Sequence, residues 1–159
     1  MAEQKTNVMR LLDQKKIKYT AREYPHSDAP VDGVTAAALM GQDPARVFKT
    51  LVARGASKKI YVFDIPAAAE LDLKKAAKAV GEKSIAMVHV SEITALTGYV
   101  RGGCSPVGMK KPFPTYFHST CTDFDFIYVS AGMRGLQLKI NPADLVRFVG
   151  ATVCDLIAE

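Results

Sequence analysis

The segment from residue 97 to residue 111 holds an unusual mixture of chemically useful groups. It contains four glycines, a proline, two aliphatic hydroxyl groups, a thiol and three cations between apolar segments. Gly102 and Gly103 have no Cβ, so their backbone can adopt positive φ and let a ligand approach closely, whereas Pro106 stiffens the turn. Ordinary turns are about two to five residues long, so this one is longer than a connection requires. The segment is therefore predicted to be a ligand-binding loop whose N–H groups face one point.

Lys49 is a second candidate, because it interrupts an apolar strand pattern. In residues 47–53 a period of two places Lys49 on the same face as Leu51 and Ala53. Burying an ammonium group without a partner costs free energy, so on such a face it should meet an anion, a ligand carbonyl or solvent. The alternative is that Lys49 lies at a sheet edge and extends to water over its apolar stem. The sequence leaves both interpretations open.

Three further side chains have an adequate structural explanation. Asp144 lies three residues after Asn141, the predicted N-cap of a helix, where an acid favours the helix dipole. Tyr24 is predicted to be a packed aromatic residue. Cys104 lies in the glycine-rich loop, but no adjacent histidine or positioned base supports a role as nucleophile.

Several catalytic motifs are absent from the chain. It has no G-x-x-x-x-G-K-[ST], no H-E-x-x-H and no G-x-S-x-G sequence. His26, His89 and His118 are scattered singly, and each is predicted to be a surface or structural histidine. We therefore expect no metal and no cofactor, and neither a metalloenzyme nor a nucleotide hydrolase is favoured.

Length and composition indicate one globular domain over residues 1–159. The three cysteines are an odd number without a C-x-x-C pair, which favours free thiols in a reducing compartment. No secretory signal and no apolar run long enough for a membrane are visible, so we expect a cytoplasmic protein. The net charge of +5 favours an anionic partner, although the lysine clusters are explained equally well as solvated faces.

Strand patterns outnumber helix patterns, and several strands form hairpin-like pairs. This favours an α+β fold with a mixed sheet, and periodicity does not show whether the sheet closes. Helices are predicted at 4–16, 33–40, 73–80, 91–97 and 142–149, with Asp72, Ser91 and Asn141 as N-terminal caps, and strands at 17–24, 47–53, 60–65, 85–88, 115–117, 126–129, 136–140 and 152–157.

Several motifs together resemble the YbaK/EbsC family of aminoacyl-tRNA deacylases, which is related to the editing domain of bacterial prolyl-tRNA synthetases. The resemblance covers nearly the whole chain and is greatest to the free-standing Cys-tRNA(Pro) deacylases. It implies a single domain with a mixed, mostly antiparallel, barrel-like sheet flanked by helices. The motifs are Phe48-Lys49-Thr50-Leu51, residues 71–78, Thr97-Gly98-Tyr99, residues 102–108, residues 127–132 and Arg134-Gly135-Leu136.

The same resemblance implies a site and a reaction. The essential lysine of the family falls on Lys49, and its GxxP loop, whose amides surround the aminoacyl carbonyl, falls on residues 103–106. In the Cys-specific members the substrate's own thiol attacks its carbonyl and leaves a cyclic thiolactone, so no triad or metal is needed. Lys49 then holds the substrate or a phosphate. The implied catalytic residues are Lys49, Gly103, Cys104 and Ser105, and the implied substrate-binding residues are Tyr24, Pro106, Ser130, Gly132 and Asp144.

The implied partners are mischarged tRNA(Pro) and prolyl-tRNA synthetase, and neither DNA nor a membrane. One alternative is a deacylase for another small residue on tRNA(Pro), such as alanine. Another is a non-catalytic module that binds tRNA or a synthetase. Relatives of this type commonly carry an aliphatic residue at the position of Cys104, so a Cys104 side chain that faces the pocket would affect substrate choice.

Overall fold

The computed structural model describes residues 5–25 and 32–158. Its helices are α1 (Asn7–Gln14), α2 (Gly33–Leu39), α3 (Leu73–Val80), α4 (Val90–Thr97) and α5 (Pro142–Val149), with 3₁₀ turns at Pro44–Arg46 and Ser119–Asp123. Its strands are β1 (Tyr19–Glu23), β2 (Phe48–Gly55), β3 (Ile60–Pro66), β4 (Ile85–Met87), β5 (Thr115–His118), β6 (Ile127–Met133), β7 (Leu136–Ile140) and β8 (Thr152–Cys154). None of these helices is long and apolar enough to cross a membrane.

Local capping explains where the helices begin and end. The Asp72 carboxylate accepts from the first N–H groups of α3, and Gly81 ends that helix at a φ of 77°. Asn141 caps α5 in the same way, so both predicted caps are confirmed. The predicted cap at Ser91 is wrong, because α4 already begins at Val90. The N-cap is His89, whose backbone N–H donates to the Glu92 carboxylate at 3.1 Å.

The strands form two sheets. One has the order β1-β7-β6 and is antiparallel throughout, and the other has the order β4-β2-β3-β5-β8. In the second sheet β5 pairs in parallel with both β3 and β8, whereas the β2–β3 hairpin and the β2–β4 pair are antiparallel. A single parallel bridge from Val47 to Tyr128 links the start of β2 to β6. The α+β class and the mixed, mostly antiparallel pairing are confirmed. Among residues 5–25 and 32–158, pairing between the two sheets is limited to this bridge, so the described strands do not close into a barrel.

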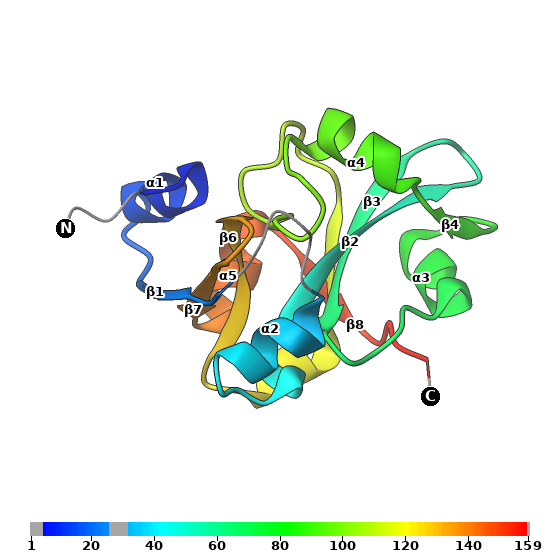
Figure 1. Ribbon diagram of the computed structural model, residues 1–159. Coiled ribbons are helices and arrows are strands. Elements are labelled where there is room, and N and C mark those ends of the chain that lie inside the picture. Colours follow the sequence, from blue (N-terminus) through cyan, green and yellow to red (C-terminus); the bar gives the residue numbers. More distant parts are fainter. Residues whose placement is uncertain (1–4, 26–31, 159) are drawn as a thin grey trace.

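The hydrophobic core has three parts that follow this arrangement. The largest lies between the first sheet, α1 and α5, and it includes the stacked rings of Phe48 and Phe117, whose centroids are 6.3 Å apart. A second part packs α3 against β3, and a third packs α2 against Tyr24, Val47 and Tyr128. In Figure 1, α1 accordingly lies beside β1 and β7, and α3 lies on the side of β4. In the same figure the segment after α4 is drawn between α4 and β6, and Gly103 in this segment lies close to the end of β6.

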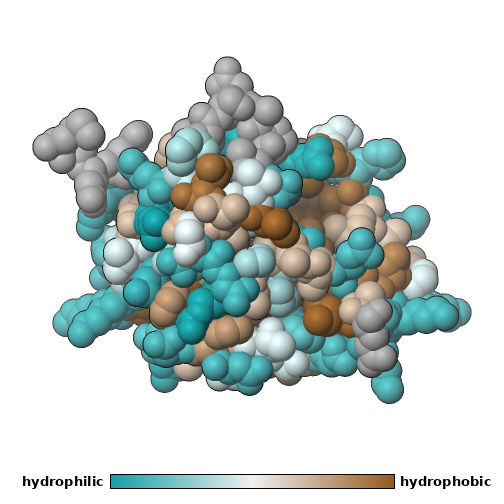
Figure 2. Space-filling view, turned by 60° about the horizontal axis from the view of Figure 1, so that its bottom comes forward, coloured by the Kyte–Doolittle hydropathy of each residue, from teal (hydrophilic) through white to brown (hydrophobic). Residues whose placement is uncertain are grey.

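On the face drawn in Figure 2, hydrophilic residues make up most of the surface and hydrophobic residues gather in small clusters. Three of the large apolar side chains that remain exposed, Val34, Met87 and Val90, line one pocket of the molecule. Exposed apolar groups at the edge of a concave site are typical of ligand binding.

Candidate active site

A pocket of about 960 Å³ brings together segments that lie far apart in the sequence. The glycine-rich loop forms one wall, and β2 and the start of α2 form others. The first sheet, the end of β4 and the first turn of α4 contribute further lining residues. Besides Gly102, its lining includes the side chains of Tyr24, Asp32, Thr35, Lys49, Thr50, Arg101, Cys104, Ser130 and Gln137, each of which carries a polar group or a thiol. The volume falls within the range of small-molecule sites, about 300–1,000 Å³.

Thr97 closes the base of the glycine-rich loop. Its hydroxyl donates to the Ile93 carbonyl at 2.8 Å and accepts from the Tyr99 N–H at 3.0 Å. Its carbonyl accepts from the Lys110 N–H at 2.9 Å, so both ends of the loop are tied to one buried residue. At the far side of the loop the Tyr99 hydroxyl donates to the Val107 carbonyl. These bonds hold the backbone of the loop in one conformation.

The loop also docks against the turn between β6 and β7. A Cβ on Gly103 would lie 3.0 Å from the backbone N of Arg134 and from Met133, which is tighter than ordinary contact. Arg134 completes this contact by donating from Nε to the Arg101 carbonyl at 2.7 Å. Gly102, at a φ of 86°, makes the bend that this approach requires.

Two of the three expected amide groups make no hydrogen bond within the described residues, and of these two residues Cys104 lines the pocket. The Gly103 N–H donates to the Val100 carbonyl at 3.0 Å. In contrast, the N–H groups of Cys104 and Ser105 donate to no acceptor in the described part of the chain. The Ser105 side chain is fully buried and its Oγ accepts from the Val107 N–H at 3.2 Å, so its hydroxyl supports the loop. Pro106 is buried beside it.

Cys104 lines the pocket, but its thiol is poorly suited to act as a nucleophile. Burial raises the pKa of Cys104 to about 12, with a smaller contribution from the negative charge of Asp64. The side chain is therefore a neutral thiol at physiological pH, and a neutral thiol attacks carbonyl groups poorly.

Lys49 is half-buried and lines the same pocket. Burial lowers the pKa of Lys49, and the negative charges of Glu70 and Asp32 act against that shift. Among the described residues no carboxylate lies within ion-pairing distance of its ammonium group. This favours the interpretation in which Lys49 meets a ligand.

Tyr24 and Ser130 also line the pocket, as the resemblance implies. Tyr24 packs in the core beside α2, and its backbone N–H donates to the Gly135 carbonyl at 3.0 Å. Ser130 is buried, and its Oγ accepts from the Gly132 N–H at 3.1 Å.

Gln137 is a pocket residue that the sequence did not reveal. It pairs directly with Ser130 across β6 and β7, and it is only 7% exposed. Its Oε1 is buried without a hydrogen-bond partner among the described residues. Side chains alternate between the two faces of a strand, so Gln137 lies on the other face of β7 from Leu136 and Leu138. The local pattern assigns this face to solvent. The only signal was a polar residue within an apolar strand.

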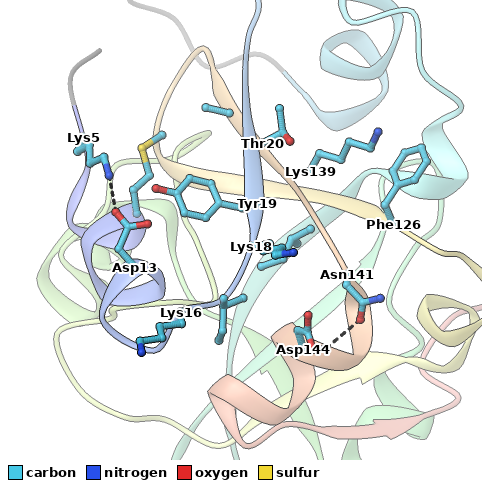
Figure 3. Close-up of a pocket in the computed structure, with 14 residues that line it drawn as sticks. Lys5, Asp13, Lys16, Lys18, Tyr19, Thr20, Phe126, Lys139, Asn141 and Asp144 are labelled. Atoms are coloured by element: carbon cyan, nitrogen blue, oxygen red, sulfur yellow. Dashed lines mark hydrogen bonds and ion pairs between the residues drawn. The ribbon is translucent and has the colours of Figure 1, made fainter. Parts of the chain in front are cut away.

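Asp144 and Gly132 lie outside this pocket. Figure 3 shows Asp144 in a separate groove near Lys16, Lys18 and Asn141. Its carboxylate pairs with Arg147 at 2.8 Å, and its N–H donates to the Asn141 cap at 3.1 Å, so the structural interpretation of Asp144 accounts for what it contacts.

Gly132 instead makes room for its neighbours. Its φ is 101°, and a Cβ there would lie 3.1 Å from Val8 and 3.2 Å from the Tyr99 ring. The residue therefore serves the packing of α1 and of the glycine-rich loop.

The described histidines make structural contacts. His118 is buried, and its Nδ1 accepts from the Leu156 N–H at 3.1 Å, while His89 begins α4. His26 lies outside the described residues. Across residues 5–25 and 32–158, no three His, Cys, Asp or Glu side chains form a group that could hold a metal ion.

Comparisons with known proteins show which proteins this chain resembles. The chain is 41% identical over 157 residues to EbsC of Enterococcus faecalis, covering 99% of this chain and 96% of that protein, which is named as a proposed Cys-tRNA(Pro)/Cys-tRNA(Cys) deacylase. A crystal structure described as a proposed trans-editing enzyme for prolyl-tRNA synthetase is 26% identical, with a TM-score of 0.82 over 96% of this chain and 95% of its own. A crystal structure of a hypothetical protein has a TM-score of 0.85 at 22% identity over 95% of this chain and 99% of its own, a likeness of fold alone.

The family comparison covers most of the chain, and it includes every residue that lines the pocket except Tyr24. The sequence pattern described as the aminoacyl-tRNA editing domain matches residues 29–148. This range contains Lys49, the glycine-rich loop and the Ser130–Gln137 pair. The chain belongs to the aminoacyl-tRNA editing domain family.

Proposed function

We propose that this protein is a deacylase that hydrolyses the ester between cysteine and tRNA(Pro). The observation that carries the proposal is the pair of amides at Cys104 and Ser105, which donate to no acceptor among the described residues. They belong to the loop that contributes Cys104 to the pocket lined by Lys49. Fixed N–H donors of this kind stabilise the negative charge that develops on a carbonyl oxygen during acyl transfer. The 41% identity to a proposed Cys-tRNA deacylase supports the choice of substrate.

The proposed reaction uses the thiol of the substrate. Its sulfur gives up the thiol proton to water and attacks the carbonyl carbon of the same cysteine, so that a C–S bond forms and the bond to the ribose oxygen breaks. The ribose oxygen takes up a proton, and the resulting thiolactone is then hydrolysed by water. The amides of Cys104 and Ser105 hold the carbonyl oxygen throughout, and holding the thiol close to the carbonyl supplies much of the acceleration.

Two other side chains position the substrate in this scheme. The Lys49 ammonium holds the anionic or carbonyl part of the aminoacyl end. The Oε1 of Gln137, which has no hydrogen-bond partner in the part of the chain that the structure describes, accepts a hydrogen bond from the α-ammonium group. The pocket volume leaves room for the terminal ribose beside the amino acid.

The tRNA(Pro) specificity is proposed to come from prolyl-tRNA synthetase. That enzyme accepts cysteine because the two side chains have similar bulk, and a second site must then remove the product. We place the reaction in the cytoplasm, where that synthetase releases its product.

The test is deacylation of Cys-tRNA(Pro), Cys-tRNA(Cys) and Ala-tRNA(Pro) by the purified protein. We expect rapid hydrolysis of the cysteinyl esters, and a preference for Cys-tRNA(Pro) once prolyl-tRNA synthetase is added. Equal or faster hydrolysis of Ala-tRNA(Pro) would instead assign the protein to alanine, because that substrate has no thiol. Binding of tRNA without hydrolysis of any ester would make it a non-catalytic module.

A further inference from the structure

Asp64 is a buried carboxyl group that the proposed reaction does not use. It lies in β3, directly opposite Thr50 of β2, and its side chain is fully buried. The Thr50 hydroxyl oxygen and the Asp64 Oδ1 are 2.5 Å apart, while Oδ2 has no hydrogen-bond partner among the described residues. Thr50 itself is half-buried and lines the pocket beside Lys49.

The surroundings of Asp64 favour its protonated form. Phe117 of β5 pairs with it on the other side, and Cys104 and Cys121 are the titratable groups that feel its charge. No described cation contributes to its titration. Burial raises the pKa of Asp64 to about 8, and the hydrogen bond with Thr50 only partly opposes this. The carboxyl group is therefore mainly neutral at pH 7.

The protonation state of Asp64 decides which atom donates in its bond with Thr50. A protonated carboxyl group has one O–H to donate, whereas a carboxylate only accepts. The Thr50 hydroxyl has one proton and two lone pairs. When Asp64 is protonated, it donates to Thr50 and the Thr50 proton is free to point into the pocket. When Asp64 is ionised, that proton is bound to the carboxylate and only lone pairs face the ligand.

We propose that Asp64 is a positioning residue that keeps the Thr50 hydroxyl a hydrogen-bond donor toward the aminoacyl group, and that its ionisation withdraws this donor. The inference rests on the proposed deacylase function. It makes the Thr50 contribution to catalysis dependent on pH, although Thr50 itself does not titrate in this range.

The experiment compares wild type with Thr50→Val, which removes the hydroxyl at nearly constant shape, and with Thr50→Ser, which keeps it. We measure kcat/KM for Cys-tRNA(Pro) from pH 6 to pH 10 for each protein. The ratio of wild type to Thr50→Val is expected to fall from about tenfold at low pH, the value of one good hydrogen bond, to near one above the Asp64 titration. Thr50→Ser is expected to follow wild type.

Asp64→Asn supplies the second arm, because its amide donates at every pH. In the Asp64→Asn background we compare kcat/KM of the protein that keeps Thr50 with kcat/KM of the protein that also carries Thr50→Val. The ratio of these two values is expected to stay constant with pH. Two results overturn the inference. One is a ratio of wild type to Thr50→Val that does not change with pH when Asp64 is present. The other is a ratio that falls equally with pH in the Asp64→Asn background.

A measurement without substrate separates this inference from the proposed function. The Asp64 carboxyl carbon is followed by ¹³C NMR as a function of pH, with Asp64→Asn to assign its signal. We expect a titration near pH 8 that moves higher in Thr50→Val, because the hydrogen bond that lowers this pKa is lost. Titration at the ordinary carboxyl value, about pH 4, overturns the inference and leaves the deacylase proposal standing, whereas failure of wild type to hydrolyse any ester overturns the deacylase proposal.

Discussion

Gly103 packs backbone to backbone against Arg134, so the wall of the pocket is docked on the turn between β6 and β7. A Cβ at Gly103 would lie 3.0 Å from the Arg134 backbone N. The atoms in the way belong to the main chain of a strand end and cannot move aside as a side chain can. The position of the Cys104 and Ser105 amides thus depends on a contact between two segments about thirty residues apart.

The first prediction follows directly from this contact. Gly103→Ala pushes the loop away from Arg134 and moves the two amides off the carbonyl oxygen. Overpacking of this kind costs about 1–3 kcal/mol of unfolding free energy, and removing one oxyanion donor costs about a hundredfold or more in kcat. We expect a melting temperature lower by a few degrees and a much larger loss of activity. Wild-type kcat in this variant would contradict the assigned role of the loop.

Lys49→Ala is expected to lower deacylation by at least about a hundredfold, as removal of a preorganised charge does elsewhere. The side chain is half-buried, so the thermal midpoint is expected to stay within a few degrees of wild type. The matched control is Lys59→Ala, which removes an exposed lysine from the β2–β3 turn and is expected to keep full activity. Full activity of the Lys49→Ala variant would show that Lys49 has no role in the reaction.

Gln137→Leu separates a binding role from a packing role. The substitution removes a buried acceptor that has no partner among the described residues, so the unfolding free energy is expected to stay the same or rise. Activity is expected to fall about ten- to a hundredfold, mainly through KM, because a hydrogen bond to the charged α-ammonium group is lost. Chemical denaturation and steady-state kinetics on one preparation test both parts. A less stable but fully active variant would indicate a packing role alone.

Cys104→Ala is expected to keep kcat within about threefold of wild type, since the backbone amide survives the substitution. The raised pKa of Cys104, about 12, also predicts slow alkylation of this thiol at neutral pH and faster alkylation only at strongly alkaline pH. Mass spectrometry of the protein after iodoacetamide treatment at several pH values follows the modification. Rapid alkylation of Cys104 at pH 7, together with loss of activity, would indicate that Cys104 acts as a nucleophile.

The raised pKa of Asp64 predicts how the free energy of unfolding depends on pH. Its folded-state pKa of about 8 lies above the unfolded value of 3.8, so the folded protein binds the extra proton between these limits. The contribution to stability is therefore fully present below about pH 4, and it is lost as the pH rises to about 8, by at most about 1.4 kcal/mol per pH unit. Denaturation of wild type and Asp64→Asn across this range measures the difference. The difference in unfolding free energy, wild type minus variant, is expected to decrease with pH and then level off; a difference that is independent of pH contradicts the assignment.

The sequence by itself determined the local features of this protein. These features depend on residues that are close together in the chain, so the conformational preferences of single residues and short patterns predict them. They include the helix caps Asp72 and Asn141, the β2–β3 hairpin and the glycine-rich loop. The sequence also singled out Lys49, since an ammonium group in an apolar strand is visible without a structure. The resemblance, which rests on the order of these motifs, led to the editing domain family that the comparisons then showed.

Only the tertiary structure decided which residues share the pocket. Gln137 enters it although alternation along β7 assigned its face to solvent, and Asp144 lies outside it although the resemblance implied a substrate-binding role. The Gly103 amide is used within the loop, and Asp64 meets Thr50 through the register of two strands. The physical reason is that burial and hydrogen-bond partners are set by packing between distant segments, and a local period describes only one strand or helix at a time.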